Sequence, residues 1–318
     1  MKKIFLIFSM LLVLLPAQTI IPTQEIEASG YVYDITVDNN GHLYIGSGKG
    51  ELQVYDYNAK KFVKRITLPK IKDFMGDEIE PKVFSVDYLN GKYLLLSEGK
   101  SGYRELYIHE NNSTKKIISV EEKQAIAKAK FVDESHLFMA NLGNEVMLYN
   151  LETKKERYRF QISQSKFSDF ALNISKDTAV IGCESGEISV VDVQKGRVVK
   201  ILKGQNLDNT YKVAISNGIV TGAGQDRRGS FYQIESGKGD YVEGSFLIYA
   251  TALSPSGDLG AFAINEENDI AIYNLTTKAQ IALLKGQKST LNTILFLDEK
   301  RLFSASSDPK VMLWELEN

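Results

Sequence analysis

From Gly30 onward, the chain alternates short hydrophobic runs with clusters of Gly, Asn, Asp and Ser. The runs are rich in Val, Ile, Tyr and Phe, whose branched and aromatic side chains pack well on a pleated surface. The clusters between them have the composition of turns. The pattern therefore predicts an all-β protein built from many short strands.

One unit recurs along this pattern, an apolar pair followed in most copies by a polar residue. Its middle residues are Tyr55, Tyr107, Tyr149, Val191, Tyr232, Tyr273 and Trp314. They are 52, 42, 42, 41, 41 and 41 residues apart. A four-stranded blade of a β-propeller takes roughly 40–45 residues. The seven copies therefore predict a seven-bladed β-propeller.

Each unit has the same internal order of strands and turns. The unit around Tyr273 predicts strands over residues 250–253, 259–264, 270–273 and 279–284, and the unit around Val191 over 170–174, 178–183, 187–191 and 198–202. The first strand of each unit is expected at the axis and the last at the rim. Each unit thus predicts one four-stranded blade.

The two ends of the chain predict how the ring closes. Only four residues follow Trp314, so the seventh unit lacks an outer strand. Residues Thr19–Ala28 have strand-like composition, and we expect them to pair with Val311–Glu315. Closure would remove an open sheet edge, which promotes aggregation. A disordered N-terminal segment is the alternative.

The repeat resembles that of the WD-repeat family of seven-bladed propellers. The Trp-Asp pair of that family corresponds to Tyr55-Asp56, Val191-Asp192 and Trp314-Glu315. Its Gly-His pair is reduced to the glycines of Lys203-Gly204 and Lys285-Gly286. The resemblance implies a His–Asp network in each blade, which the missing histidines make doubtful. Blade packing is then expected to rest mainly on apolar contact.

The first residues have the pattern of an export signal. Lys2 and Lys3 precede the apolar run Ile4–Leu15, and Pro16-Ala17 follows it. The run is shorter than the roughly 20 residues that span a bilayer. We therefore expect a signal peptide over residues 1–17, general secretory export to the periplasm, and a propeller over residues 18–318 without a stable membrane anchor. A retained anchor is the alternative.

A narrower resemblance concerns the whole chain. Its size, signal sequence, single cysteine and blade count are similar to those of the NapL group, accessory proteins of periplasmic nitrate reductase in Campylobacter-like bacteria. That resemblance implies a monomeric protein that supports maturation or activity of the reductase, with protein partners and no chemistry of its own.

Composition narrows the functional classes. The 38 Lys and Arg against 40 Asp and Glu give a net charge of −2, and no long basic block occurs, which argues against nucleic-acid binding. His42, His109 and His136 fall at different depths of three blades, so we predict no metal or catalytic site there. Cys183, the one cysteine, is expected to be a buried, inert thiol. No cofactor is expected.

An insertion of about ten residues explains the long first spacing of 52. It spans residues 71–81 and places acidic residues around an apolar pair, namely Asp73, Phe74, Met75, Asp77, Glu78 and Glu80. Because function concentrates in loops on rigid scaffolds, this segment is a candidate partner-docking loop. A surface loop without a function is an equally open alternative.

Two smaller features complete the candidates. Arg227 and Arg228 follow Asp226 in an expected polar turn and could pair with carboxylates of a partner, although a solvated turn is the simpler interpretation. Asn112 lies in the sequon Asn112-Ser113-Thr114 with Glu110 two residues before it. This arrangement is similar to the extended bacterial glycosylation sequon, so Asn112 is a candidate glycan acceptor.

Two functions remain open at this stage. The first is a non-enzymatic periplasmic protein-interaction scaffold, because nothing in the chain calls for a cofactor. The second is a periplasmic propeller hydrolase, similar to a lactonase, that uses polar residues at the axis. A carboxylate or histidine cluster holding a cation at the axis would favour the enzyme.

Overall fold

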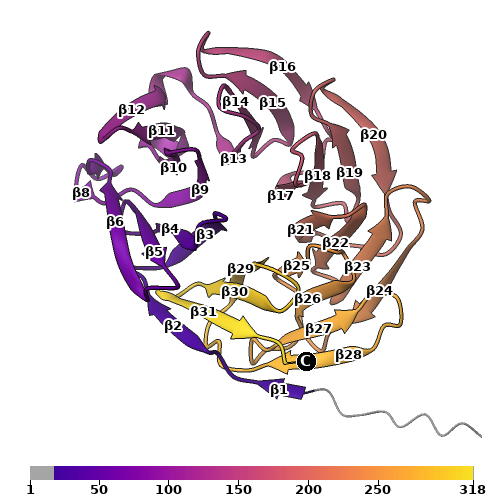
Figure 1. Cartoon of the computed structure of the whole chain (residues 1–318). Helices are drawn as coiled ribbons and strands as arrows, with labels where there is room; N and C mark the ends of the chain where they lie inside the picture. The colour runs from indigo at the N-terminus through magenta and orange to yellow at the C-terminus, as the bar shows by residue number, and fades with distance from the viewer. Residues whose placement is uncertain (1–17, 318) are drawn as a thin grey trace, which may run out of the picture.

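The hydrophobic runs of the sequence form β-strands, which the computed structural model describes for residues 18–317 (Figure 1). These residues form seven blades of four or five strands around one axis, together with one small two-stranded hairpin. The prediction of an all-β, seven-bladed β-propeller is confirmed. The expected signal peptide, residues 1–17, lies outside the described part of the chain.

Four consecutive strands, ordered from the axis outward, form each of the first five blades. Blade 1 contains β3 (Val32–Val37), β4 (His42–Ser47), β5 (Glu51–Asp56) and β6 (Lys61–Thr67); blade 2 contains β9 (Val83–Leu89), β10 (Lys92–Glu98), β11 (Arg104–Glu110) and β12 (Ser113–Ile118). Blade 3 contains β13 (Ile126–Phe131), β14 (His136–Asn141), β15 (Glu145–Asn150) and β16 (Lys155–Gln161). Blade 4 contains β17 (Phe167–Leu172), β18 (Thr178–Cys183), β19 (Ile188–Asp192) and β20 (Arg197–Leu202).

The remaining blades follow the same order, with the N-terminal segment added at the rim. Blade 5 contains β21 (Thr210–Ser216), β22 (Ile219–Gly224), β23 (Arg228–Gln233) and β24 (Gly239–Glu243). Blade 6 contains β25 (Thr251–Leu253), β26 (Leu259–Ala263), β27 (Ile270–Asn274) and β28 (Gln280–Leu284), and blade 7 contains β29 (Leu291–Phe296), β30 (Arg301–Ser306) and β31 (Lys310–Glu315). All seven middle residues of the recurring unit lie on the third strands, as the spacing predicts.

The polar residue that ends the recurring unit has a structural role. In blade 1, the carboxylate of Asp56 accepts hydrogen bonds from the backbone N–H groups of Asn58, at 3.0 Å, and Ala59, at 2.7 Å. The side chain therefore forms the turn between the third and outer strands, as Asp and Asn commonly do. The same arrangement recurs at Asn150, Asp192 and Asn274.

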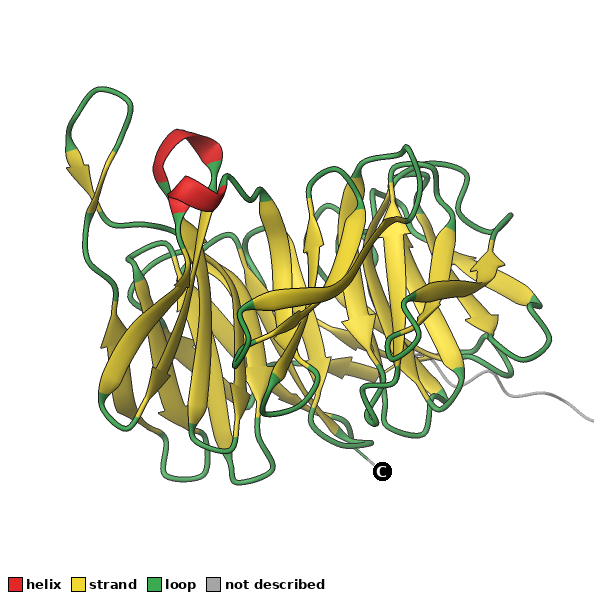
Figure 2. Cartoon of the chain, turned by 90° about the horizontal axis from the view of Figure 1, so that it is seen from above, coloured by secondary structure: helices red, strands yellow, loops and turns green. Residues whose placement is uncertain are grey.

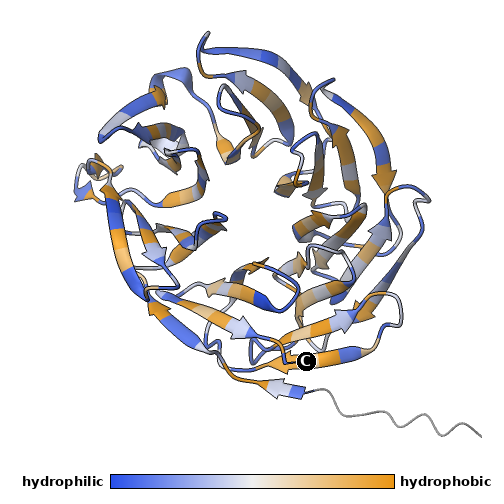
Figure 3. Cartoon of the chain, in the orientation of Figure 1, coloured by the Kyte–Doolittle hydropathy of each residue, from blue (hydrophilic) through white to orange (hydrophobic). Residues whose placement is uncertain are grey.

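The core lies between the blades, because the middle strands are covered on both faces. In β14, the four residues Leu137–Ala140 are all buried, whereas the outer strand β20 alternates exposed and half-buried residues. Figure 3 shows hydrophobic residues along the strands and hydrophilic ones in the turns. Phe138 of blade 3 and Phe170 of blade 4 meet edge to face, 5.1 Å apart, so one blade packs directly on the next.

The N-terminal segment closes the ring at two blades. Strand β2 (Gln24–Glu27) pairs antiparallel with β31, which confirms the expected clasp on blade 7. Strand β1 (Gln18–Ile20) instead pairs parallel with β28 of blade 6, a pairing that was not expected from the sequence. Ile26 is 2% exposed, whereas Ile21, between the two strands, is 73% exposed. The segment therefore joins the last two blades at the rim (Figure 1).

A polar network inside blade 7 adds to the apolar packing of the blades. Gln287 directly follows Gly286, where the WD-repeat family has histidine. Its side-chain amide donates to Ser306, and its carbonyl accepts from Ser304 at 2.9 Å. Ser304 in turn accepts from the Trp314 indole at 2.9 Å. The Gln287 amide can connect both serines because it combines a donor with an acceptor.

Blade 5 contains a second amide network. Asn206 donates to the Asp226 carboxylate at 3.2 Å and to the Arg228 carbonyl at 3.0 Å, and it accepts from Ser230. Asn206 is 3% exposed. Its hydrogen bonds connect the loop between β20 and β21 to β23. Buried polar groups joined in this way fix the position of a loop.

Candidate functional site

The inserted segment forms a hairpin of β7 (Ile71–Lys72) and β8 (Glu78–Ile79), here called the finger, residues 71–79. It connects the outer strand of blade 1 to the inner strand of blade 2. Figure 2 shows it projecting from one face of the ring, beside the 3-10 turns η1 (Lys100–Gly102) and η2 (Val120–Glu122). We call this side the finger face; the inner strands begin there.

The tip of the finger presents apolar side chains to solvent. Phe74 is 95% exposed and Met75 is 71% exposed. Their turn is held by Asp73, whose carboxylate accepts from the backbone N–H groups of Met75 and Asp77, both at 2.9 Å. The predicted residues therefore have different roles: Asp73 holds the turn, whereas Asp77 and Glu78 are exposed charges. The finger is thus a preformed apolar tip with an acidic border.

The base of the finger is fixed to the seam between blades 1 and 2. Glu80 forms an ion pair with Lys49 at 3.5 Å, so its charge is partly neutralised. Gly50 has a positive φ of 70° and lies against Pro81, where an added Cβ would be 3.0 Å from the proline ring. This close approach positions the chain where it leaves the finger for blade 2.

Two clusters of aromatic side chains lie near the starts of inner strands, on the finger face. Tyr33 and Phe84 meet edge to face with ring centroids 5.3 Å apart, and the guanidinium of Arg104 lies over Phe84 at 4.2 Å. On the other side, Tyr211 and Tyr249 stack with centroids 5.0 Å apart. Half-exposed aromatic and Arg side chains are common in protein interfaces, so this face has the character of one.

The two candidate arginines have different surroundings. Arg227 is exposed and adopts a left-handed conformation with φ of 65°. Arg228 is half-buried: its guanidinium lies 4.3 Å from the centre of the Tyr241 ring and donates to the Gln205 carbonyl at 3.1 Å. Arg228 is thus already engaged within blade 5, and only Arg227 remains an exposed candidate.

The remaining candidates lie in ordinary structural positions. His42 and His136 begin second strands and contact Asp38 and Asp133, each at 3.0 Å, while His109 lies near the end of β11. Cys183 is 3% exposed, as expected. Asn112 is exposed in the turn between β11 and β12 with φ of 59°. The structure does not bring these residues together.

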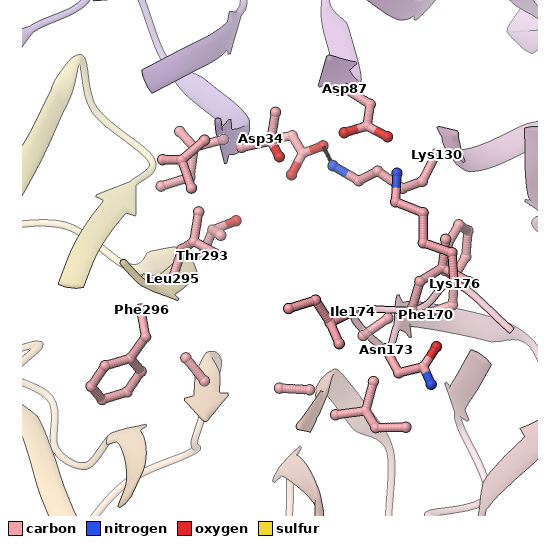
Figure 4. Close-up of a pocket in the computed structure, with 18 of the residues that line it drawn as sticks. Asp34, Asp87, Lys130, Phe170, Asn173, Ile174, Lys176, Thr293, Leu295 and Phe296 are labelled. Atoms are coloured by element: carbon pink, nitrogen blue, oxygen red, sulfur yellow. Dashed lines mark hydrogen bonds and ion pairs between the residues drawn. The ribbon is translucent and has the colours of Figure 1, made fainter. Parts of the chain in front are cut away.

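A cavity of about 730 Å³ occupies the axis and opens on the face opposite the finger. All seven inner strands line it, together with residues of the turns that follow β3, β9 and β17. Figure 4 shows Asp34, Asp87 and Lys130 on one part of the wall, Ile174 and Phe170 on another, and Leu295 and Phe296 across from them. The cavity lies within the usual volume range of small-molecule sites, roughly 300–1,000 Å³.

Charged side chains form the inner end of this cavity. Lys130 donates to the Asp34 carboxylate at 2.8 Å, and Lys128 donates to the Asp169 carboxylate at 2.7 Å. Asp34, Lys128, Asp169 and Lys212 also line a small hollow of about 70 Å³ on the finger side. These four charged residues, with Lys130, form a charged layer that lies between the cavity and the small hollow.

The charged layer shifts the ionisation of its members. Burial raises the pKa of Asp34, but the charges of Lys130 and Lys128 outweigh burial, so the pKa of this carboxyl lies below its ordinary value. Burial lowers the pKa of Lys130, yet Asp34 and Asp87 raise it above the ordinary value. Burial lowers the pKa of Lys128, and Asp169 offsets this only in part. Asp34 and Lys130 are thus a stable ion pair.

This axial layer was not predicted from the sequence. The available signal was a charged residue within an apolar inner-strand run, as in Val32-Tyr33-Asp34-Ile35 and Ala127-Lys128-Ala129-Lys130-Phe131. Among residues 18–317, no group of three or more His, Cys, Asp or Glu side chains is placed to hold a metal ion. In the same residues, no helix has the length and apolar character needed to cross a bilayer.

Comparison with known proteins gives one limited similarity. No protein-family model matches the chain. Over 73 residues, 22% of its length, it is 32% identical to the CCR4-associated factor 4 homolog of Candida glabrata. The chain spans 13% of that relative's length. The alignment covers less than two repeat lengths.

Proposed function

We propose that this protein is a non-enzymatic interaction scaffold of the periplasm, and that its partner is a component of periplasmic nitrate reductase. The observation that carries the scaffold is the finger, whose Phe74 and Met75 are 95% and 71% exposed on a turn held by Asp73. Exposed apolar side chains on a preformed loop are typical of docking elements. The export pattern of residues 1–17 and the resemblance to the NapL group support the location and the partner.

The chemistry of the finger defines the surface that would accept it. Burial of a Phe side chain contributes about 1.5–3 kcal/mol, enough to change affinity by roughly 10- to 100-fold. Asp77 and Glu78 border the apolar tip, so the partner surface is an apolar pocket with basic residues at its rim. The two aromatic clusters of the same face provide a second area of contact.

Affinity capture from the periplasm of the source bacterium tests this proposal. Tagged wild-type protein is compared with the Phe74→Ser/Met75→Ser variant. The matched control is Val199→Ser/Ile201→Ser, which removes two apolar side chains, 50% and 51% exposed, from the outer strand of blade 4. We expect nitrate reductase subunits with the wild type and the control, and at least a tenfold loss with the finger variant.

Two results of this experiment would contradict the proposal, one for the finger and one for the partner. Equal capture by the finger variant would show that the finger does not dock. Absence of nitrate reductase subunits from the wild-type sample would remove that partner.

One observation favours the alternative function, a propeller hydrolase. Asp34, Asp87 and Asp169 converge on the cavity, and carboxylates can serve as general bases. However, Asp34 and Asp169 each form an ion pair with a lysine, which holds the carboxylates in structural contacts. Hydrolysis of a lactone or ester panel that is lost in the Asp87→Asn variant would support the enzyme over the scaffold.

A further inference from the structure

We propose that Asn40 is a site of spontaneous deamidation at the mouth of the axial cavity, where the backbone nitrogen of Gly41 displaces the side-chain amide and water completes the conversion to aspartate or isoaspartate. Asn40 lies on the face opposite the finger, so the inference is independent of the proposed scaffold function. It rests on the three Asn-Gly pairs of the chain, because the structure restrains the other two asparagines and leaves Asn40 without such restraints.

The reaction needs only the chain and water. The Gly41 nitrogen forms a bond to the side-chain carbonyl carbon of Asn40, and the bond from that carbon to Nδ2 breaks. Nδ2 leaves as ammonia with the proton of the Gly41 N–H, so a five-membered imide ring remains. Water then opens the ring, adding its hydroxyl to one of the two carbonyl carbons and a proton to the nitrogen. A following glycine favours the attack, because it has no Cβ to crowd the nitrogen. The product has one more negative charge than asparagine.

The chain provides its own comparison for this site. Its three Asn-Gly pairs are Asn40-Gly41, Asn90-Gly91 and Asn217-Gly218. Each pair lies in the turn between the inner and second strands of its blade, in blades 1, 2 and 5. All three asparagines are exposed, so water reaches each of them. The local sequence chemistry is therefore the same, and the structure decides which asparagine reacts.

Two of the asparagines are held in place. The Asn90 side-chain amide donates to the Glu134 carboxylate at 2.8 Å, and the Asn217 amide donates to the Ser256 carbonyl at 2.8 Å. Their backbones are left-handed, with φ of 46° and 44°, and so are the glycines that follow, with φ of 86° and 76°. Two consecutive residues with positive φ form the hairpin turn that best fits the twist of the strands. Both the amide and the backbone must therefore leave a stable arrangement before the ring can close.

Asn40 has neither restraint. Its side chain makes no hydrogen bond within residues 18–317, and its backbone is not left-handed. In the same part of the chain, the backbone N–H of Gly41 donates to no carbonyl. By contrast, Gly257 in the corresponding turn of blade 6 donates to the Ser254 carbonyl at 2.9 Å. The attacking nitrogen and the leaving amide are thus both unbonded at Asn40.

The position of Asn40 gives the modification a structural effect. Asn40 and Asp38 both line the axial cavity. The Asp38 carboxylate holds the turn by accepting from the backbone N–H groups of Asn40 and His42, both at 2.9 Å. Isoaspartate would lengthen the backbone by one carbon inside this turn, and either product would place a second carboxylate in the same turn as Asp38, where like charges repel. Deamidation therefore changes both the shape and the charge of the cavity mouth.

Peptide mapping by mass spectrometry tests the proposal with the three pairs in one sample. The purified protein is incubated in mildly alkaline buffer, folded or in guanidinium chloride, and aspartate and isoaspartate are quantified at positions 40, 90 and 217. In the folded protein we expect conversion at Asn40 to be at least about fivefold faster than at Asn90 or Asn217, because each of these must first break a hydrogen bond. In denaturant the three rates should be similar. Equal rates in the folded protein, or the same ranking in denaturant, would overturn the proposal.

A variant tests whether the hydrogen bond gives the protection. Glu134→Ala removes the partner of the Asn90 amide and should raise the rate at Asn90 about threefold or more, while the rate at Asn40 stays unchanged. Glu152→Ala is the matched control, because Glu152 is also an exposed carboxylate in a turn of blade 3 but bonds to Ser135 instead. An unchanged rate at Asn90 in Glu134→Ala, or an equal rise in the control, would overturn the inference.

Discussion

Lys130, on the inner strand of blade 3, reaches Asp34 of blade 1 at 2.8 Å, although 96 residues separate them in the chain. On the way it donates to the carbonyl of Val86 in blade 2 at 2.6 Å. One lysine therefore connects three consecutive blades at the axis. Its side chain is 16% exposed, so this ion pair is shielded from most of the solvent.

Removal of Lys130 should destabilise the propeller. In Lys130→Met, Asp34 remains buried without its cation, and such a loss costs about 3–5 kcal/mol. The Asp34→Asn/Lys130→Met double variant should lose less than the two single variants combined, because no unpaired charge remains. Urea unfolding of the four proteins measures both effects. Additive losses would contradict a direct pair.

The Asp34 carboxylate should also affect how the free energy of unfolding falls at acid pH. The pKa of Asp34 is lowered in the folded protein, mainly because the charges of Lys130 and Lys128 outweigh the opposing effect of burial. Its contribution is therefore fully present above the unfolded pKa, near 3.9, and is lost as the pH falls through the lower folded pKa. Chemical unfolding at several pH values below about 5 should show a shallower decline for Asp34→Asn than for the wild type. An identical pH dependence would contradict the shift.

The amide network of blade 7 can be tested through the single tryptophan. Gln287→Leu leaves Ser304 and Ser306 without their buried partner, which should cost about 1–3 kcal/mol. Gln287→His restores a donor and an acceptor and should recover part of that loss. Trp314 fluorescence during unfolding reports the event directly, since its indole donates to Ser304. Equal stability of the Leu and His variants would show that the network contributes shape only.

A matched pair of isoleucines tests the clasp. Ile26→Asp places a carboxylate at a site that is 2% exposed between β2 and its neighbours, and we expect a loss of about 3 kcal/mol or more together with dimers or aggregates from the open edge of β31. Ile21→Asp, at 73% exposure, should change stability by less than about 0.5 kcal/mol. Size-exclusion chromatography and thermal unfolding provide the comparison. A silent Ile26→Asp would contradict closure by β2.

Blade number and the order of strands within a blade could be predicted because each blade repeats the same local chemistry. Residues such as Asp56 and Asp192 must end the third strand to form the following turn, so their spacing records the blades. The parallel pairing of Gln18–Ile20 with blade 6 could not be predicted, because three residues have no distinctive period. The role of Gln287 could not be predicted, because a search for the Gly-His pair of WD repeats does not find a glutamine. Its side chain nevertheless donates and accepts hydrogen bonds as a histidine can.

The candidate sites also differ in whether the sequence could predict them. The finger was predictable from an irregular spacing and from its composition, since both are local properties of the sequence. The axial layer depends on contacts such as Asp34 with Lys130, which only the closed ring brings together. Arg228 looked free in the sequence because its partner, the Tyr241 ring, lies on the next strand.

Site-specific photo-crosslinking tests whether the finger docks on a partner. A photoreactive phenylalanine analogue is placed at position 74 of the finger or at position 201 of the blade 4 rim, and the cells are irradiated. The account predicts a crosslinked product with a nitrate reductase component from position 74 and none from position 201. No product from position 74, or the same product from both positions, would contradict it.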